Sequence, residues 1–250
     1  MNTATPAPTR ALVPWIGDRS GGRSEGGSSP VHFDPRRHGD APFFDLARSL
    51  DRIGWAAPLG RERPSWVFYD CALMPGSMFG FGLPAAAVPA EVLGALGVSA
   101  ATAAYEGLVP LSMLALIPTI DGHDLVQSLT AVDLAGVTAE ELANATLRAG
   151  MSALGAGTLT AAVPWRSAFL SRFLAVGPLR VRTAWTPAHD EPRTVTFSVA
   201  AGGIAATDDV FALDPEDDEA LTTLQREVEQ GATLSIVATS GRAFTLARGR

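Results

Sequence analysis

The spacing of hydrophobic and polar positions changes several times along the chain, and each spacing predicts a kind of element. Behind Asp40, apolar residues recur at helical spacing through 43–53 and stop at Gly54, which predicts a capped helix. Thr138 and Glu141 form the sequence pattern of a capping box, which satisfies free amides of a first helical turn. Helices are predicted over residues 40–54, 89–96, 138–153, 165–174 and 214–231.

Other stretches alternate with a period of two, which predicts strands. Residues 66–73 are mostly apolar on both alternating faces, which indicates a strand covered on both sides. The turn signal Asp121-Gly122 separates the apolar segments 109–120 and 125–134 and predicts a hairpin. Two further hairpins are predicted from strands at 179–185 with 194–199, and at 232–238 with 243–247.

This order of elements predicts an α+β fold, with an antiparallel or mixed curved sheet and helices packed mainly on one face. Residues 1–40 are rich in Gly, Ser, Pro and charge, which predicts a disordered or docking N-terminal tail. Residues 41–250 are predicted to form a single globular α+β domain. Inside the tail, residues 11–16 are apolar, and two interpretations are open: a docking segment, or a strand or clasp on the domain.

The charge composition excludes several classes of function. The formal net charge of −7 argues against a nucleic-acid partner, because phosphate binding requires a basic face. All 19 basic residues are arginine, which excludes Schiff-base chemistry and the phosphate-binding lysine of P-loop enzymes and kinases. We therefore predict no lysine-bound cofactor, and none of another kind. The lysine-free composition is typical of a GC-rich genome and suggests a bacterial protein.

Two further features limit where the protein acts and how it is held together. The most apolar run, 108–120, contains two prolines and is too short to span a bilayer, and no signal peptide is visible, so we expect a soluble, cytoplasmic protein with no membrane partner. The single cysteine, Cys71, excludes an internal disulfide and is interpreted as a small buried hydrophobe.

The aromatic stripe along 165–174 is interpreted as core, with Arg166 and Arg172 off that stripe.

The first candidate site is the stretch 66–84. A buried carboxylate costs free energy unless it is paired or protonated, so Asp70 is either bonded to amides of the next loop or an acid or base at a cleft. The segment 74–84 is rich in glycine and proline, which predicts a loop that is packed for shape or lines an apolar ligand site. The predicted substrate-binding residues are Tyr69, Met74, Ser77, Met78, Phe79, Phe81 and Asp121.

The second candidate acid or base is His123, in the predicted hairpin turn. It is either a solvated turn residue or a general base that Asp121 or Asp124 orients. A metal role would require a second histidine, which would have to be the remote His189, so no metal site is predicted. We predict Asp70 and His123 as the catalytic residues and expect them to line the same hollow.

These residues predict a small-molecule enzyme without a lysine-bound cofactor. Its substrate would have an apolar body and a carbonyl or acyl group, and the chemistry would be general acid–base catalysis. The alternative is a non-catalytic assembly or carrier protein that uses the N-terminal tail and apolar loops to contact a protein partner or a second copy of itself. A third hypothesis, an anion or nucleotide binder using Arg180 and Arg182, lacks a phosphate-binding fingerprint.

Overall fold

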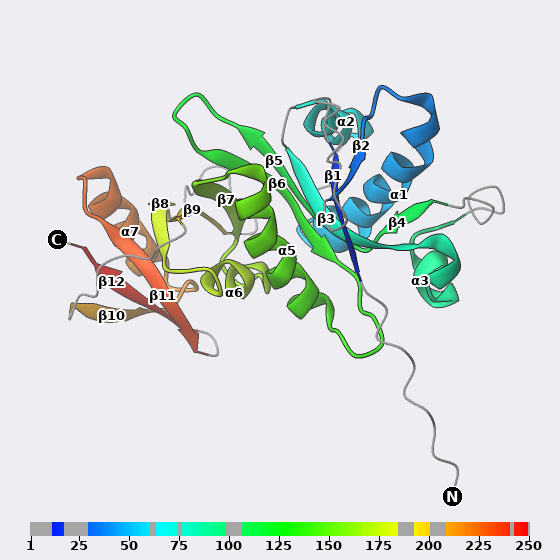
Figure 1. The fold of residues 1–250 in the computed structure, drawn as a ribbon. Coiled ribbons are helices and arrows are strands. Elements are labelled where there is room, and N and C mark those ends of the chain that lie inside the picture. Colours follow the sequence, from blue (N-terminus) through cyan, green and yellow to red (C-terminus); the bar gives the residue numbers. More distant parts are fainter. Residues whose placement is uncertain are drawn as a thin grey trace, which may run out of the picture.

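A computed structural model describes residues 12–17, 30–60, 64–74, 77–98, 107–184, 193–200, 209–240 and 243–249. Within these ranges, twelve strands form one mixed, open, curved sheet in the order β10-β12-β11-β8-β9-β7-β6-β5-β3-β1-β2, and β4 pairs with β3 (Figure 1). Six α-helices accompany the sheet in the same ranges. The predicted α+β class with a curved sheet is therefore confirmed.

The element bounds in the N-terminal half are β1 (Val13–Gly17), β2 (Val31–Phe33), α1 (Ala41–Asp51), α2 (Ser65–Leu73), β3 (Met78–Pro84), α3 (Ala90–Ala95), β4 (Leu108–Pro110), β5 (Ser112–Pro118) and β6 (Asp124–Ala131). Those in the C-terminal half are α5 (Ala139–Leu154), β7 (Thr158–Pro164), α6 (Phe169–Leu174), β8 (Leu179–Thr183), β9 (Thr194–Ala200), β10 (Val210–Leu213), α7 (Asp218–Glu229), β11 (Leu234–Ser240) and β12 (Ala243–Arg248). A five-residue π-helix, η2 (Arg52–Ala56), continues α1.

Helices cover both faces of the central strands. Thr130 of β6 donates its hydroxyl to the carbonyl of Leu50 (3.3 Å), so α1 covers the face on which Thr130 lies. On α5, a Cβ added to Gly150 would lie 2.8 Å from a methyl carbon of Leu114. Leu114 pairs with Leu129, the neighbour of Thr130, and therefore points to the opposite face.

Two clusters of buried apolar side chains form the core. One surrounds α1, α2 and α3 with the strands from β1 to β5, and the other surrounds α6 and α7 with the strands from β7 to β12. Helix α5 joins them, because its Leu142 belongs to the first cluster and its Leu147 to the second. In Figure 1, α5 lies across the middle strands between these two regions.

The prediction of a strand at residues 66–73 is wrong, because this segment is the helix α2. A short run that is apolar all round does not distinguish a buried strand from a buried helix by its periodicity. The flanking residues carry the missing signal. Pro64 takes the N-cap position, and the helix ends with an extended Met74 just before Pro75.

The segment predicted as a glycine-rich loop is largely a strand, β3. Its glycines allow close approach of neighbouring chain instead of forming turns. A Cβ at Gly80 would lie 2.0 Å from the carbonyl oxygen of Ser112 and 2.6 Å from the Trp15 ring. A Cβ at Gly82 would lie 2.5 Å from the carbonyl oxygen of Val109. Glycine inside a strand marks such backbone contacts.

Two strands come from the first forty residues. β1 pairs antiparallel with β3, with Trp15 opposite Gly80, and β2 pairs parallel with β1. Trp15 is fully buried. Of the two interpretations of the apolar residues 11–16, the structure shows the strand. Residues 1–11 and 18–29, which belong to the predicted tail, lie outside the described ranges.

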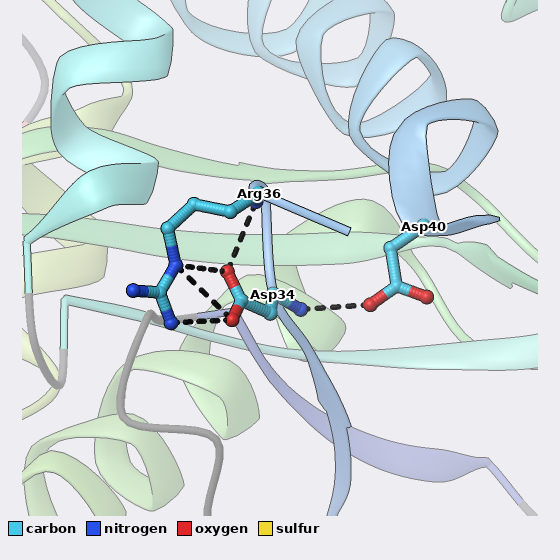
Figure 2. Close-up of polar contacts among 3 residues, drawn as sticks. All are labelled: Asp34, Arg36 and Asp40. Carbon is cyan, nitrogen blue, oxygen red and sulfur yellow. Dashed lines mark hydrogen bonds and ion pairs between the residues drawn. The ribbon is translucent and has the colours of Figure 1, made fainter. Parts of the chain in front are cut away.

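A polar turn connects β2 to α1 (Figure 2). The buried Asp34 carboxylate accepts hydrogen bonds from the backbone and the guanidinium of Arg36, with a shortest distance of 2.7 Å. Asp40 accepts a hydrogen bond from the Asp34 backbone amide at 2.8 Å instead of capping α1 with its side chain. The bonds from the side chain and the backbone of Arg36 hold the pKa of Asp34 at about 2, below its ordinary value of 3.8.

The other predicted helices and hairpins are confirmed with small shifts in their ends. The capping box of Thr138 and Glu141 is present at the start of α5. Helix α7 is capped by Asp217, slightly later than predicted, and α6 begins at Phe169. The three predicted hairpins are the antiparallel pairs β5–β6, β8–β9 and β11–β12. Gly54 does not end its helix, because α1 continues through it as η2.

Candidate functional site between strands β6 and β7

Strands β6 and β7 are parallel neighbours that part soon after they begin. They pair only where Asp124 faces Leu159 and Leu125 faces Thr160. Beyond this point β6 stays paired with β5 and β7 stays paired with β9, so the two strands follow different neighbours. The sheet therefore opens between the later residues of β6 and β7, and an open sheet between strand ends is a place where ligands bind.

The opening leads to a cavity of about 660 Å³. This volume lies within the range of about 300–1,000 Å³ that small-molecule sites have. Its walls come from η2 and the segment after it, the last residue of β6, the last residue of β7, the residues that precede α6, and α6 itself. The lining residues are Gly54, Pro58, Leu59, Gly60, Ala131, Pro164, Arg166, Ser167, Ala168, Phe169 and Arg172.

The apolar wall of the cavity is anchored by an aromatic contact. Trp55 of η2 and Phe169 of α6 are both buried, and their ring centroids are 4.5 Å apart. Gly54 lets η2 approach β6, because a Cβ at this position would lie 1.7 Å from the Thr130 hydroxyl oxygen. Short π-helical segments are often found at functional sites, and this one positions both a cavity residue and the ring behind it.

Arg172 is the main polar group of the cavity. Its guanidinium lies 4.4 Å from the centroid of the Phe169 ring, and its Nη1 donates to the carbonyl of Leu129 at 3.3 Å. Burial lowers the pKa of Arg172, partly opposed by the charge of Glu140, and an arginine so placed keeps its proton at neutral pH. Arg172 forms no ion pair with any carboxylate in the described ranges.

The second arginine of the lining is neutralised by its surroundings. The Nε atom of Arg166 lies 3.0 Å from a carboxylate oxygen of Glu216, and both side chains are about half exposed. Ser167 accepts a hydrogen bond from the backbone amide of Phe169 at the start of α6. Among the described lining residues, Arg172 is thus the arginine whose charge no ion pair neutralises.

The residues predicted for the first site lie on α2, on β3 and directly next to these elements. Asp70 is exposed on α2. The Tyr69 hydroxyl donates to Asp45 at 3.1 Å, and burial together with this bond raises the pKa of Tyr69. The buried Ser77 hydroxyl donates toward the carbonyls of Cys71 and Met74, at 2.6 and 2.8 Å, and so satisfies the end of α2.

The apolar members of the predicted first site have several environments. Met78 and Phe79 are buried, Phe81 is partly buried, and Met74 is exposed. The rings of Phe79 and Phe81 contact edge to face, with centroids 5.4 Å apart. None of these residues lines the cavity between β6 and β7.

His123 lies at the turn of the β5–β6 hairpin, as predicted. Its Nδ1 is 3.2 Å from the hydroxyl of Thr160 and 4.0 Å from the carboxylate of Asp121. The hydroxyl of Thr119 donates to Asp121, and this bond lowers the pKa of that carboxyl. Partial burial raises the pKa of Asp124.

The hairpin turn and the cavity lie at opposite ends of β6. His123 precedes the strand and Ala131 ends it, which separates them by roughly 25 Å at about 3.3 Å per residue. Figure 1 shows the β5–β6 turn standing clear of α2, which carries Asp70. Neither predicted catalytic residue is part of the cavity lining.

The cavity residues do not stand out as a site in the sequence. Arg166 and Arg172 lie beside an aromatic stripe that was interpreted as core, and this interpretation holds for the buried Phe169. The two arginines could have indicated the site, because each places a charged group next to the buried aromatic face. That signal is weak without the knowledge that β6 and β7 part beside α6.

A second cavity, of about 360 Å³, lies between α7 and strands β10 and β12. The arginine in its described lining, Arg248, is held by Glu227 at 3.2 Å and by Asp209 at 3.6 Å. Its guanidinium also lies 4.3 Å from the centroid of the Phe211 ring. Because the charge of Arg248 is already matched, this cavity is a weaker candidate for binding.

Across the described ranges, no group of three or more His, Cys, Asp or Glu residues is placed to hold a metal ion. No helix in the part of the chain that the structure describes is long and apolar enough to cross a lipid bilayer. No model of a known protein family and no curated protein sequence matches the chain. The residues of the cavity are therefore the basis for inferring function.

Proposed function

We propose that this protein acts on a small molecule with an apolar body and a carbonyl or acyl group, which it binds in the cavity between β6 and β7. The observation that carries the proposal is Arg172, a partly buried cation in a mostly apolar cavity with no ion pair to a described carboxylate. A buried charge without a partner costs free energy, and a ligand oxygen offsets that cost. Leu59 and Phe169 offer apolar surface beside it.

The lining supports one kind of catalytic contribution more than others. A guanidinium near a carbonyl oxygen stabilises the negative charge that develops there when the carbonyl is attacked. The described lining contains no imidazole or carboxylate, so Arg166, Ser167 and Arg172 are its polar side chains. General acid–base catalysis by Asp70 and His123 stays a prediction. Full activity of both Asp70→Asn and His123→Ala variants on an identified substrate would remove it.

The first experiment is native mass spectrometry of the purified full chain, followed by a thermal-shift screen of apolar carbonyl compounds. We expect a retained or added small molecule whose stabilisation is lost in Arg172→Gln and kept in Arg226→Gln. Arg226 is an exposed arginine on α7 that does not line this cavity, so its variant changes the net charge equally. A ligand that stabilises the wild-type chain and Arg172→Gln to the same degree would disprove the proposed site.

The same measurements address the predicted partners. A carrier or assembly protein would elute as an oligomer or with a bound protein, and light scattering during size-exclusion chromatography measures this directly. A strict monomer with a bound small molecule favours the enzyme proposal. The acidic, lysine-free composition supports the further proposal that the protein works in a bacterial cytoplasm.

A further inference from the structure

The charge balance of the β6–β7 cavity narrows the class of its ligand. Arg166 is neutralised by Glu216 at 3.0 Å, whereas Arg172 bonds to the uncharged carbonyl of Leu129. The described lining contains no acidic residue. Within the described lining, a ligand therefore meets one positive charge, that of Arg172, which forms no ion pair there.

A carboxylate matches that charge better than a neutral carbonyl does. Hydrogen bonds between a guanidinium and an ionised acceptor are about twice as strong as those to a neutral acceptor. Arg172 is partly removed from water, which costs free energy and lowers its pKa. An anion offsets this cost, whereas a neutral oxygen offsets only part of it. The cost therefore adds to the preference for a carboxylate. The planar guanidinium also fits the two oxygens of a carboxylate.

The neighbouring start of α5 opposes a phosphate. Helix N-termini are common phosphate sites because their first amides are free, but here the amides of Ala139 and Glu141 donate to Asp133 and to the Thr138 hydroxyl, at 2.7 and 3.2 Å. The carboxylate of Glu141 in turn accepts the amide of Thr138 at 2.9 Å. The acidic side chains at this end of α5 would repel a phosphate dianion.

Glu140 adds to the acidic character of the start of α5, although it does not line the cavity. It lies on the first turn of α5, close enough to act on the charge of Arg172. A second negative charge on a ligand would therefore be repelled, while a single charge is balanced by the guanidinium.

We infer that the cavity takes an apolar monocarboxylate, with its carboxylate on Arg172 and its chain or ring against Leu59 and Phe169. The inference rests on the proposed function and names the ligand class for the same site. The cavity volume of about 660 Å³ lies within the range of small-molecule sites, which is enough for a ligand of this class.

The test uses three probes of similar length: octanoate, methyl octanoate and octyl phosphate. Binding to the full chain is measured by isothermal titration calorimetry for the wild type, Arg172→Gln, Arg172→Lys and Arg226→Gln. Octanoate should bind the wild type and Arg226→Gln alike and lose about tenfold or more in affinity with Arg172→Gln. Arg172→Lys keeps the charge, so it should still prefer octanoate over the ester, and it provides a readout if the glutamine variant folds poorly.

The possible results separate the ligand class from the site. If methyl octanoate or octyl phosphate binds as tightly as octanoate, and Arg172→Gln weakens that binding, the monocarboxylate inference is overturned while the proposed cavity stands. If no probe binds the wild type, or if neither Arg172 variant changes the binding, the proposed function itself fails. A preference for octanoate that disappears with Arg172→Gln and persists in Arg172→Lys supports both.

Discussion

The contact between η2 and β6 gives a prediction that tests how the cavity is built. We consider the substitution Gly54→Ala. The new Cβ would lie 1.7 Å from the hydroxyl oxygen of Thr130 and 3.0 Å from its Cβ, where ordinary contacts begin at 3.4 Å. The Thr130 hydroxyl already donates to the carbonyl of Leu50, so it cannot rotate away without losing that bond. Relief of the clash therefore requires the loss of this bond together with a movement of the η2 backbone away from β6.

The expected cost follows from three effects. Overpacking in a core typically costs about 1–3 kcal/mol, and loss of the Thr130 hydrogen bond adds about 1 kcal/mol. Alanine is favoured over glycine in a helix by about 1 kcal/mol, which offsets part of this. The Gly54→Ala chain should thus lose about 2 kcal/mol of unfolding free energy, or about 4–8 °C in Tm for a chain of this length.

The assay is urea denaturation followed by tryptophan fluorescence, with calorimetry for Tm. Trp55 follows the substituted glycine and is buried against Phe169, so its emission reports on this contact. Thr130→Ala removes the clashing oxygen, and the double variant should recover at least about 1 kcal/mol relative to additivity. Gly94→Ala is the matched control, because a Cβ there meets nothing within 4 Å. It should leave stability unchanged or slightly raised.

Two results would refute this reasoning. If Gly54→Ala unfolds at the same urea concentration as the wild type, the close approach of η2 to β6 does not exist. If Gly54→Ala and Thr130→Ala are simply additive, the loss does not come from the contact between these two residues. Reduced ligand binding in Gly54→Ala at unchanged stability would also contradict it, because the same movement is expected to alter both.

Further predictions concern a cap and two carboxylates. Thr138→Ala removes the capping box of α5 and should cost about 1 kcal/mol in chemical denaturation. Arg36→Gln should destabilise the chain at neutral pH, and its difference from the wild type should shrink as pH falls from 3.8 to about 2, because Asp34 loses the charge that Arg36 holds. Burial raises the pKa of Asp124, so the folded state binds the proton of this carboxyl more tightly than the unfolded chain does. The unfolding free energy therefore falls as pH rises through this range. Asp124→Asn removes the charge and should raise the unfolding free energy at neutral pH. If the unfolding free energy of Arg36→Gln or of Asp124→Asn depends on pH just as that of the wild type does, the prediction for that variant is wrong.

Much of the local structure could be predicted from the chain because its determinants are close together in sequence. The capping box of Thr138 and Glu141 spans one helical turn, and the Asp121-Gly122 signal acts within one hairpin. The α+β class followed from the order of such elements. The absence of lysine is likewise a property of composition, and it limits the chemistry whatever the fold.

The sequence predictions were wrong where segments remote in sequence form the environment of a residue. Residues 66–73 are mostly apolar on both alternating faces, and this pattern fits a buried strand and a buried helix equally. Gly80 indicated a loop, but its role is to let Trp15 and Ser112 come close, and both are remote in sequence. Tertiary packing decided these positions.

The candidate site shows most clearly the difference between what local sequence determines and what tertiary packing determines. The sequence by itself determined that 165–174 has an aromatic face with two arginines beside it, because helical periodicity is a local property. It did not determine that Arg172 faces a cavity. That depends on β6 following β5 while β7 follows β9, and strand pairing is set by contacts between segments far apart in the chain.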